Sequence, residues 1–154
     1  MRIISAGLLM YRLRKGIVEV FLVHPGGPFW TGKDAGAWSI PKGIIDANEE
    51  PPAAARREFE EETGFKVPGD FTELSSVKLR SGKVLLAWAV EGDCDPSNIK
   101  SNTFLMEWPP RSGRQQEFPE ADRAAWFRIA EAKKKINQGQ VPLLDELPRV
   151  LGKK

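Results

Sequence analysis

The chain has 154 residues, of which 41% are hydrophobic and 29% are charged, and its formal net charge is +2. This length and composition are those of an ordinary globular protein that can bury a substantial core, and residues 1–154 are interpreted as a single domain. The small net charge gives no reason to expect a nucleic-acid polymer or an anionic membrane as a partner. The composition does not indicate an oligomeric state.

Three observations favour a cytoplasmic protein. Cys94 is the single cysteine, so an internal disulfide is excluded and a reducing compartment is favoured. No apolar run approaches the length of about 18 residues that a membrane-spanning helix needs. The first 16 residues contain a short apolar stretch that continues into a strand pattern, and we therefore predict no signal peptide.

The N-terminal half predicts a hairpin, a long loop and a helix. Residues 3–12 and 17–23 are rich in β-branched and apolar residues and flank a turn at 14–16. Residues 24–37 are rich in glycine and proline and predict a long loop, which is followed by a possible short strand at 38–40. A helix is predicted from Pro52 to Thr63, with Gly64 ending it.

The C-terminal half predicts more strands and two further helices. Residues 72–80 and 83–90 form a predicted hairpin across Ser81 and Gly82, and 102–108 a further strand. Residues 109–120 predict a second long loop, and 124–129 a short strand or turn. Helices are predicted at 130–137, stopped by Gly139, and at 142–151, kinked or divided by Pro148. Strands outnumber helices, which favours an α+β fold with a mixed β-sheet and helices on its faces.

The predicted helix at 52–63 carries crowded acid in the stretch EFEEETGF, residues 58–65. With about 100° of rotation per residue, Glu58, Glu61 and Glu62 share one face, while Glu60 points to the opposite side. One interpretation is a solvated helix with ion pairs from Arg56 to Glu60 and from Arg57 to Glu61. In both pairs the arginine precedes the glutamate, which is the less favourable order on a helix. The glutamates also lie near the C-terminus of the helix, where negative charge is disfavoured. The other interpretation is that the clustered oxygens bind a hard divalent cation, which would offset the repulsion.

The spacing around this helix resembles the signature of the Nudix hydrolase family, G-x5-E-x7-R-E-U-x-E-E-x-G-U with U apolar. Every fixed position matches, namely Gly43, Glu49, Arg57, Glu58, Glu61, Glu62 and Gly64, with Phe59 and Phe65 at the apolar positions. Seven specified residues at fixed spacing form a specific motif. The preceding WSIPKG and the later EFPEADRAAWF also look like parts of this family's pattern, more loosely.

The resemblance implies an α/β/α sandwich that hydrolyses a nucleoside diphosphate linked to another group. It implies Glu58, Glu61 and Glu62 as ligands of two or three Mg²⁺ or Mn²⁺ ions, with the Gly43 carbonyl often joining them. It also implies that Glu49 and Arg57 orient the loop and the helix. Metal ions would neutralise the pyrophosphate and lower the pKa of a bound water, and a carboxylate would accept the proton.

The general base is open among Glu61, Glu117 and Glu120, because members of the family differ at this point. Each loop glutamate could instead be a surface acid, and this alternative is stronger for Glu117 than for Glu120. Their place before the segment 123–127 is where such a base often lies in the family.

Several residues outside the motif are candidates for substrate binding. Lys42 is either a phosphate contact or a surface lysine, and the same choice applies to Arg111. An aromatic face can stack on a nucleobase, so Trp30, Trp38 and Trp108 are candidate base platforms, with core packing as the alternative for each. Trp88 and Trp126 are predicted core residues. His24 is predicted to be structural, because a single histidine cannot build a histidine-based zinc site.

The sequence therefore predicts a Mg²⁺-dependent pyrophosphohydrolase with a small-molecule nucleotide substrate. Dinucleoside polyphosphates such as diadenosine tetraphosphate are weakly favoured over damaged nucleoside triphosphates, by analogy alone. A non-catalytic nucleotide-binding module of the same fold is the alternative from another class. Such modules typically lose carboxylates of the motif, and all of them are present here.

Overall fold

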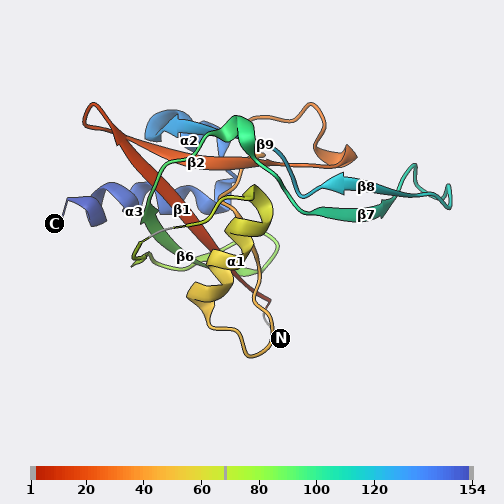
Figure 1. Ribbon diagram of the computed structural model, residues 1–154, viewed down its shortest axis with the longest axis horizontal. Helices are drawn as coiled ribbons and strands as arrows, with labels where there is room; N and C mark the ends of the chain where they lie inside the picture. The colour runs from red at the N-terminus through yellow and green to blue at the C-terminus, as the bar shows by residue number, and fades with distance from the viewer. Residues whose placement is uncertain (1–2, 68, 153–154) are drawn as a thin grey trace.

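A mixed β-sheet lies at the centre of the molecule, whose computed structural model describes residues 3–67 and 69–152 (Figure 1). The strands are β1 (Ile4–Arg14), β2 (Ile17–Pro25), β3 (Lys42–Ile44), β4 (Thr72–Glu73), β5 (Val77–Lys78), β6 (Val84–Glu91), β7 (Thr103–Glu107), β8 (Gln115–Pro119) and β9 (Ala121–Arg128). The α-helices are α1 (Pro51–Thr63), α2 (Ile129–Lys135) and α3 (Val141–Leu151), and the 3-10 helices are η1 (Pro28–Trp30), η2 (Pro96–Asn98) and η3 (Gln138–Gln140). None of the helices in the described ranges has the length and apolar character needed to span a bilayer.

The central sheet has the strand order β4-β6-β1-β2-β9, and β1 and β6 run parallel while β1 and β2 are antiparallel. β1 divides one of its edges between two partners. Residues 11–14 pair with β2, whereas residues 5–7 pair with β3. β3 thus pairs with the part of this edge that β2 does not cover. It places Lys42 and Gly43 beside the C-terminal end of β2.

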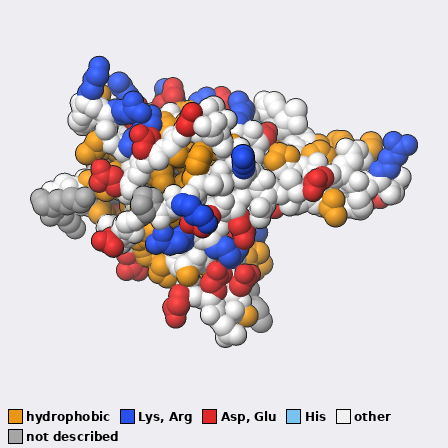
Figure 2. Space-filling model, in the orientation of Figure 1, with side chains coloured by type: hydrophobic (Ala, Val, Ile, Leu, Met, Phe, Trp, Pro, Cys, Tyr) orange, Lys and Arg blue, Asp and Glu red, His pale blue; other side chains and the backbone are white. Residues whose placement is uncertain are grey.

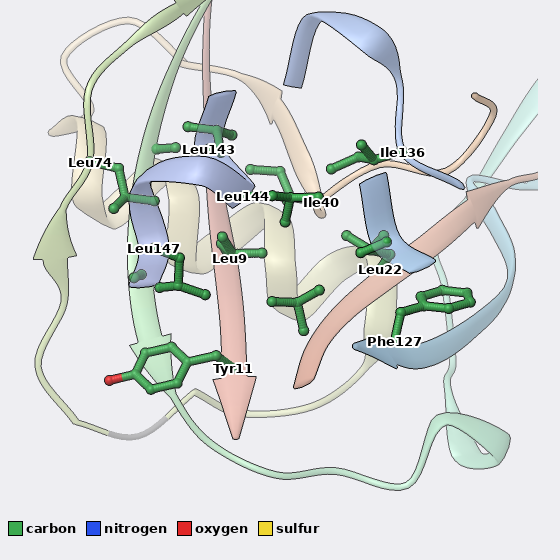
Figure 3. Close-up of a cluster of buried hydrophobic side chains, with 14 of the residues drawn as sticks. Leu9, Tyr11, Leu22, Ile40, Leu74, Phe127, Ile136, Leu143, Leu144 and Leu147 are labelled. Atoms are coloured by element: carbon green, nitrogen blue, oxygen red, sulfur yellow. The ribbon is translucent and has the colours of Figure 1, made fainter. Parts of the chain in front are cut away.

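Alternating side chains of the sheet build two separate cores. Leu8 and Phe21 face α1, where they pack with Phe59, which is fully buried. Their neighbours Leu9 and Leu22 face the opposite side and pack with Leu144 of α3 (Figure 3). The period-2 alternation of a strand therefore produces an α/β/α sandwich.

Most of the predicted elements are confirmed. The first hairpin and the helices near 52–63, 130–137 and 142–151 form, and Gly64 ends α1 with a positive φ of 80° while its N–H donates to the Glu60 carbonyl. α2 ends at Lys135, however, before the predicted stop at Gly139. Pro148 lies inside an undivided α3. The predicted strand 72–80 is reduced to the two short strands β4 and β5.

The loop predicted at 109–120 is wrong. Residues 115–119 form β8, which pairs with β7 as a two-stranded arm that projects from the body (Figures 1 and 2). Gln115, Gln116 and Glu117 are all exposed, so this strand has no buried face to give it an alternating apolar pattern. Without that pattern the segment could not be distinguished from a polar loop.

Candidate functional site

Helix α1 carries its glutamates into a cleft beside β3. Ala54, Ala55 and Phe59 are buried against the sheet, which fixes the rotation of the helix about its axis. Glu58, Glu61 and Glu62 consequently line the cleft. Glu60 lies outside this lining, and its carboxylate lies 3.5 Å from Lys66 Nζ.

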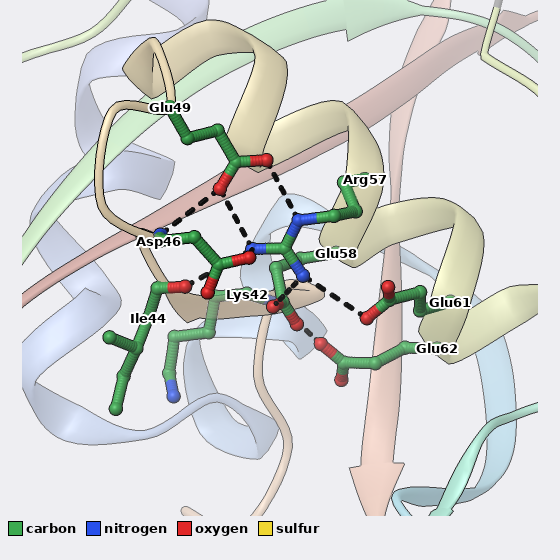
Figure 4. A network of polar contacts seen from close by, with 8 residues as sticks. All are labelled: Lys42, Ile44, Asp46, Glu49, Arg57, Glu58, Glu61 and Glu62. Atoms are coloured by element: carbon green, nitrogen blue, oxygen red, sulfur yellow. Dashed lines mark hydrogen bonds and ion pairs between the residues drawn. The ribbon is translucent and has the colours of Figure 1, made fainter.

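Arg57 joins this helix to the loop that precedes it (Figure 4). Its Nε and Nη2 donate to the two carboxylate oxygens of Glu49 at 2.8 and 3.0 Å. Its Nη2 also donates to the Ile44 carbonyl at 3.2 Å, while Nη1 donates to Glu58 at 2.8 Å and to Glu61 at 3.2 Å. The hydrogen bonds from Arg57 lower the pKa of Glu49, and those same contacts raise the pKa of Arg57 itself.

The backbone of Gly43 lies close against the Glu58 carboxylate. A Cβ at residue 43 would lie 2.0 Å from the carboxyl carbon of Glu58, so only glycine allows this approach. One residue earlier, the Lys42 N–H donates to Glu62 Oε2 at 2.9 Å. β3 is thus attached to the acidic face of α1 by its backbone.

The cleft has a volume of about 490 Å³ and faces solvent on one side. Its lining combines acidic, basic and neutral polar groups with a few apolar ones: Val23, Pro25, Ser39, Lys42, Gly43, Ile44, Asp46, Glu58, Glu61, Glu62, Asn102, Thr103 and Glu120. Figure 2 shows acidic side chains gathered over α1, with Lys and Arg side chains among them.

Crowding and burial disfavour negative charge in this cleft. The pKa of Glu62 is raised to about 8, chiefly by burial; the charge of Lys42 opposes this rise, and the nearby Glu58 contributes to it. Burial also raises the pKa of Glu58, although the hydrogen bond from Arg57 opposes this. The pKa of Glu120 is raised by partial burial and by the charge of Glu61. A cation placed among these carboxylates would favour their charged forms, and so would offset both the crowding and the burial.

The donor set of the cleft fits a hard divalent cation. Glu58, Glu61 and Glu62 offer carboxylate oxygens, and Gly43 offers a carbonyl, which are ligands that Mg²⁺ prefers. Within residues 3–67 and 69–152, however, no three acidic, histidine or cysteine side chains lie at mutual ligand spacing. The carboxylates of Glu58 and Glu61 both accept hydrogen bonds from Arg57 Nη1.

Glu120 and Glu117 occupy different environments. Glu120 lines the cleft opposite α1 and lies in a turn whose backbone is fixed on two sides. Its N–H donates to the Asn102 carbonyl at 2.8 Å, and its own carbonyl accepts from the Gly26 N–H at 3.1 Å. Glu117 lies outside the cleft lining, on the exposed arm, where Thr103 Oγ1 donates to its carboxylate at 2.6 Å.

The aromatic candidates do not line the cleft, and the proposal for Trp38 is wrong. Trp38 is 4% exposed, and its Nε1 donates to Asp34 at 2.8 Å. Its ring packs edge-on against Phe127, with the centroids 5.1 Å apart. The residue is buried because it bridges to Ile136 beyond α2, a pairing between distant segments that local sequence does not reveal.

Three further candidates lie outside the lining. Trp30 is partly exposed on η1, and Trp108 contacts Phe29 with a centroid separation of 5.6 Å. Arg111 is exposed near the tip of the projecting arm, beyond β7. Of the predicted substrate contacts, the structure therefore brings only Lys42 to the cleft.

Sequence reasoning missed several residues of the lining. Asp46 stands inside the motif, and its carboxylate lies 3.5 Å from Arg57 Nη2, so its place between Gly43 and Glu49 was a usable signal. Asn102 and Thr103 come from a segment some 40 residues farther along the chain, and no local pattern distinguishes them. Hydrogen bonds from the Lys100 and Asn102 amides to the Thr63 and Glu61 carbonyls bring this segment to α1.

Comparison with known proteins gives a consistent family relationship. The sequence model of the NUDIX domain matches residues 1–147. A CMP-5'-(N-acetyl-N-hydroxy-3-aminopropyl)phosphonate hydrolase from Streptomyces rubellomurinus (strain ATCC 31215) is 28% identical over 107 residues, which is 70% of this chain and 45% of that protein. The chain thus spans less than half the length of this relative.

Two solved structures show the same fold. The Ap4A hydrolase of C. elegans, in a binary complex, superposes with a TM-score of 0.69 at 20% identity and covers 99% of both chains. The NUDIX domain of Shewanella oneidensis NrtR complexed with ADP ribose has a TM-score of 0.68 at 15% identity, covering 98% of this chain and 89% of that one. The mixed sheet with helices on its faces is therefore a Nudix fold. Because the family model spans nearly the whole sequence and the motif is complete, this chain belongs to the NUDIX domain family.

Proposed function

We propose that this protein is a divalent-metal-dependent pyrophosphohydrolase that cleaves a phosphoanhydride bond in a nucleoside diphosphate derivative. The observation that carries the proposal is the convergence of Glu58, Glu61 and Glu62 with Glu120 and Lys42 on one open cleft. An acidic cleft of this kind would repel a pyrophosphate unless cations were bound in it. The complete motif argues against the alternative of a non-catalytic binding module.

Each group in the cleft has a role in this proposal. Glu58, Glu61, Glu62 and the Gly43 carbonyl would hold two or three Mg²⁺ or Mn²⁺ ions, which supply Lewis acidity and a water of lowered pKa. Lys42 would bind a phosphate oxygen. Arg57, through Glu49, holds the loop and the helix in register. Glu120 is our candidate for accepting the proton of the attacking water, with Glu61 as its competitor.

The substrate we favour is a dinucleoside polyphosphate. The fold matches that of an Ap4A hydrolase over 99% of both chains, and the cleft is open enough for an extended substrate. A nucleoside triphosphate pyrophosphatase is the second candidate. The phosphonate hydrolase relative adds nucleotidyl phosphonates to the compounds that should be tested.

The test is a substrate panel with Mg²⁺, with Mn²⁺ and with EDTA. The panel contains dinucleoside polyphosphates, nucleoside triphosphates, nucleotide sugars and a nucleotidyl phosphonate. We expect metal-dependent release of a nucleoside phosphate, fastest from the dinucleoside polyphosphates. Turnover of nucleotide sugars alone would contradict the substrate preference, and nucleotide binding without turnover would favour the binding module.

Two matched pairs of variants test the assigned residues. Glu61→Gln should lower kcat by at least about 10²-fold, because it removes a metal-binding carboxylate. Glu60→Gln, the same change on the other side of α1, should leave kcat unchanged. Glu120→Gln should lower kcat by roughly 10²- to 10⁴-fold at saturating Mg²⁺, and Glu117→Gln should not. Equal effects within either pair would remove the corresponding role.

A further inference from the structure

His24 is a buried histidine that the proposed chemistry does not use. It lies at the end of β2 and is 1% exposed. Its Nδ1 lies 2.9 Å from Asp122 Oδ1, and its Nε2 lies 2.7 Å from the Lys33 carbonyl oxygen. Both ring nitrogens therefore have protein partners.

Both of those partners are hydrogen-bond acceptors. A carbonyl oxygen can only accept, and so can an ionised carboxylate. The Asp122 side chain is 39% exposed to solvent, whereas the ring itself is buried. The imidazole therefore joins the Asp122 side chain on one side to the Lys33 carbonyl on the other.

Asp122 reaches His24 through a β-bulge. β2 and β9 pair with His24 opposite Arg123 and with Pro25 opposite Ala121, which leaves Asp122 as an extra residue. Bulges of this kind redirect a side chain, and they are over-represented beside active sites. Here the redirected carboxylate meets His24, two residues beyond Glu120.

The neighbouring segment of β2 makes close contact with the turn that carries Glu120. The Gly26 N–H donates to the Glu120 carbonyl at 3.1 Å. A Cβ on Gly26 would lie 2.1 Å from the Pro119 carbonyl oxygen. A shift of the bulge or of residues 24–26 would therefore move the backbone of Glu120.

Other charged and aromatic groups around the ring hold the same region. Arg123 Nε lies 3.9 Å from Asp122 Oδ1. The edge of Trp38 lies against the imidazole, with ring centroids 5.3 Å apart, and the Arg123 guanidinium lies 5.2 Å from the Trp38 ring. On the loop side, Asp34 pairs with Lys135 of α2 and accepts from Trp38 Nε1. Asp122 is thus the acidic group in contact with the ring in the described structure.

We propose that His24 is a positioning residue whose imidazole ties the loop 26–37 and the Asp122 bulge to the end of β2, and so holds Glu120 at the cleft. As far as it concerns catalysis, this inference rests on the proposed hydrolase function. The hydrogen-bonding part stands independently of it.

The hydrogen-bonding part can be tested by NMR without any substrate. His24 is the only histidine of the chain, so ¹⁵N-labelled histidine gives one assignable imidazole. We expect the ring-nitrogen signals of the wild type to show a hydrogen bond at both Nδ1 and Nε2, and the Nδ1 signal to change in Asp122→Asn. The same Nδ1 signal in the wild type and in Asp122→Asn would overturn the proposal.

The positioning part is tested with Asp122→Asn and a matched control. The control is Asp145→Asn, because Asp145 is a similarly exposed aspartate, 2.6 Å from Lys133. We expect Asp122→Asn to lower kcat roughly 10- to 100-fold with a smaller change in KM, because a small misplacement of a catalytic group is costly. Hydrogen exchange of the Gly26 amide should also become faster. Asp145→Asn should change neither.

A purely structural role gives a different result. Asp122→Asn would then lower the melting temperature while the kcat of the folded enzyme stayed at that of Asp145→Asn, and this outcome would overturn the proposal. If the wild type hydrolysed no compound of the panel, the proposed function would fail. The Nδ1 hydrogen bond and the Gly26 exchange rate would still decide whether His24 holds the Glu120 turn.

Discussion

At the scale of single residues, Arg57 holds the carboxylates beside the cleft in position. Its guanidinium pairs with Glu49 through two parallel hydrogen bonds and also draws in Glu58 and Glu61. It therefore has two effects, because it fixes the preceding loop and it partly neutralises the carboxylates. A bound divalent cation would take over the second effect but not the first.

Arg57→Lys separates charge from geometry. Lysine keeps the positive charge but cannot form the paired contact with Glu49, so we expect a loss of about 1–3 kcal/mol in the free energy of unfolding. We also expect weaker Mg²⁺ binding, measured by calorimetry. Arg56→Lys is the control, because Arg56 donates to the Val67 carbonyl on the side of α1 away from the cleft. If both variants bound Mg²⁺ equally well, Arg57 would have no role in organising the site.

Glu62 should make stability depend on pH. Burial raises the pKa of Glu62 to about 8, whereas an unfolded glutamate ionises near about pH 4.3. A raised carboxyl pKa gives stability that is complete below the unfolded pKa and is lost as the pH rises toward the folded one. In EDTA, the free energy of unfolding should therefore fall between about pH 5 and about pH 8. Urea titrations of Glu62→Gln should show a flatter dependence, and those of Glu60→Gln the wild-type slope; equal slopes would contradict this assignment.

At the scale of elements, the sequence predicted the segments whose residues show a helical or strand period or a recognisable helix end. α1 was predictable because Pro51 and Pro52 suit its first turn, its residues favour helix, and Gly64 supplies the left-handed position that ends it. The three acids on one face followed from the same 3.6-residue period. These are local properties, and the resemblance to the Nudix signature, which assigns the carboxylates of the candidate site, also lies in one continuous segment.

The remaining features depend on contacts between distant segments. The first three residues of β8 are polar and exposed because its arm projects into solvent, so no alternating apolar pattern marked it as a strand. Trp38 follows a glycine-rich loop, and local sequence could not decide between a base platform and core packing; its ring packs against Phe127 and its backbone bridges to Ile136. Local sequence could not settle the environments of Glu120 and Glu117 either, because they are set by contacts with Asn102 in one case and Thr103 in the other.

The junction between β2 and the β8–β9 turn is an element-scale contact that Gly26→Ala should disturb. The added Cβ would meet the Pro119 carbonyl oxygen at 2.1 Å, a backbone atom that cannot move alone. We expect lower stability and a kcat reduced by up to about 10²-fold, because the Glu120 turn must shift. Gly92→Ala is the control, since its Cβ would meet the flexible end of Met10 at 2.9 Å. Wild-type kcat in both variants would show that this junction does not position the site.

At the scale of the whole molecule, the sheet separates two cores that should affect the site unequally. The α1 core supports the helix that carries Glu58, Glu61 and Glu62, and the α3 core lies on the opposite face of the sheet. Phe59 and Leu144 are both fully buried, one in each core. Truncating either to alanine should cost about 2–5 kcal/mol of unfolding free energy, so general destabilisation is comparable in the two variants.

The increase in melting temperature on adding Mg²⁺ should distinguish Phe59→Ala from Leu144→Ala. A ligand that binds only the folded state raises stability by RT ln(1 + [L]/Kd), so the increase in melting temperature with MgCl₂ reports the integrity of the site. Leu144→Ala should keep the wild-type increase, because α1 and β3 remain packed. Phe59→Ala should reduce it, because α1 loses the side chain that fixes its rotation toward the cleft. NaCl at matched concentration serves as the control for ionic strength. Equal increases in melting temperature in both variants would mean that the metal site does not depend on how α1 packs.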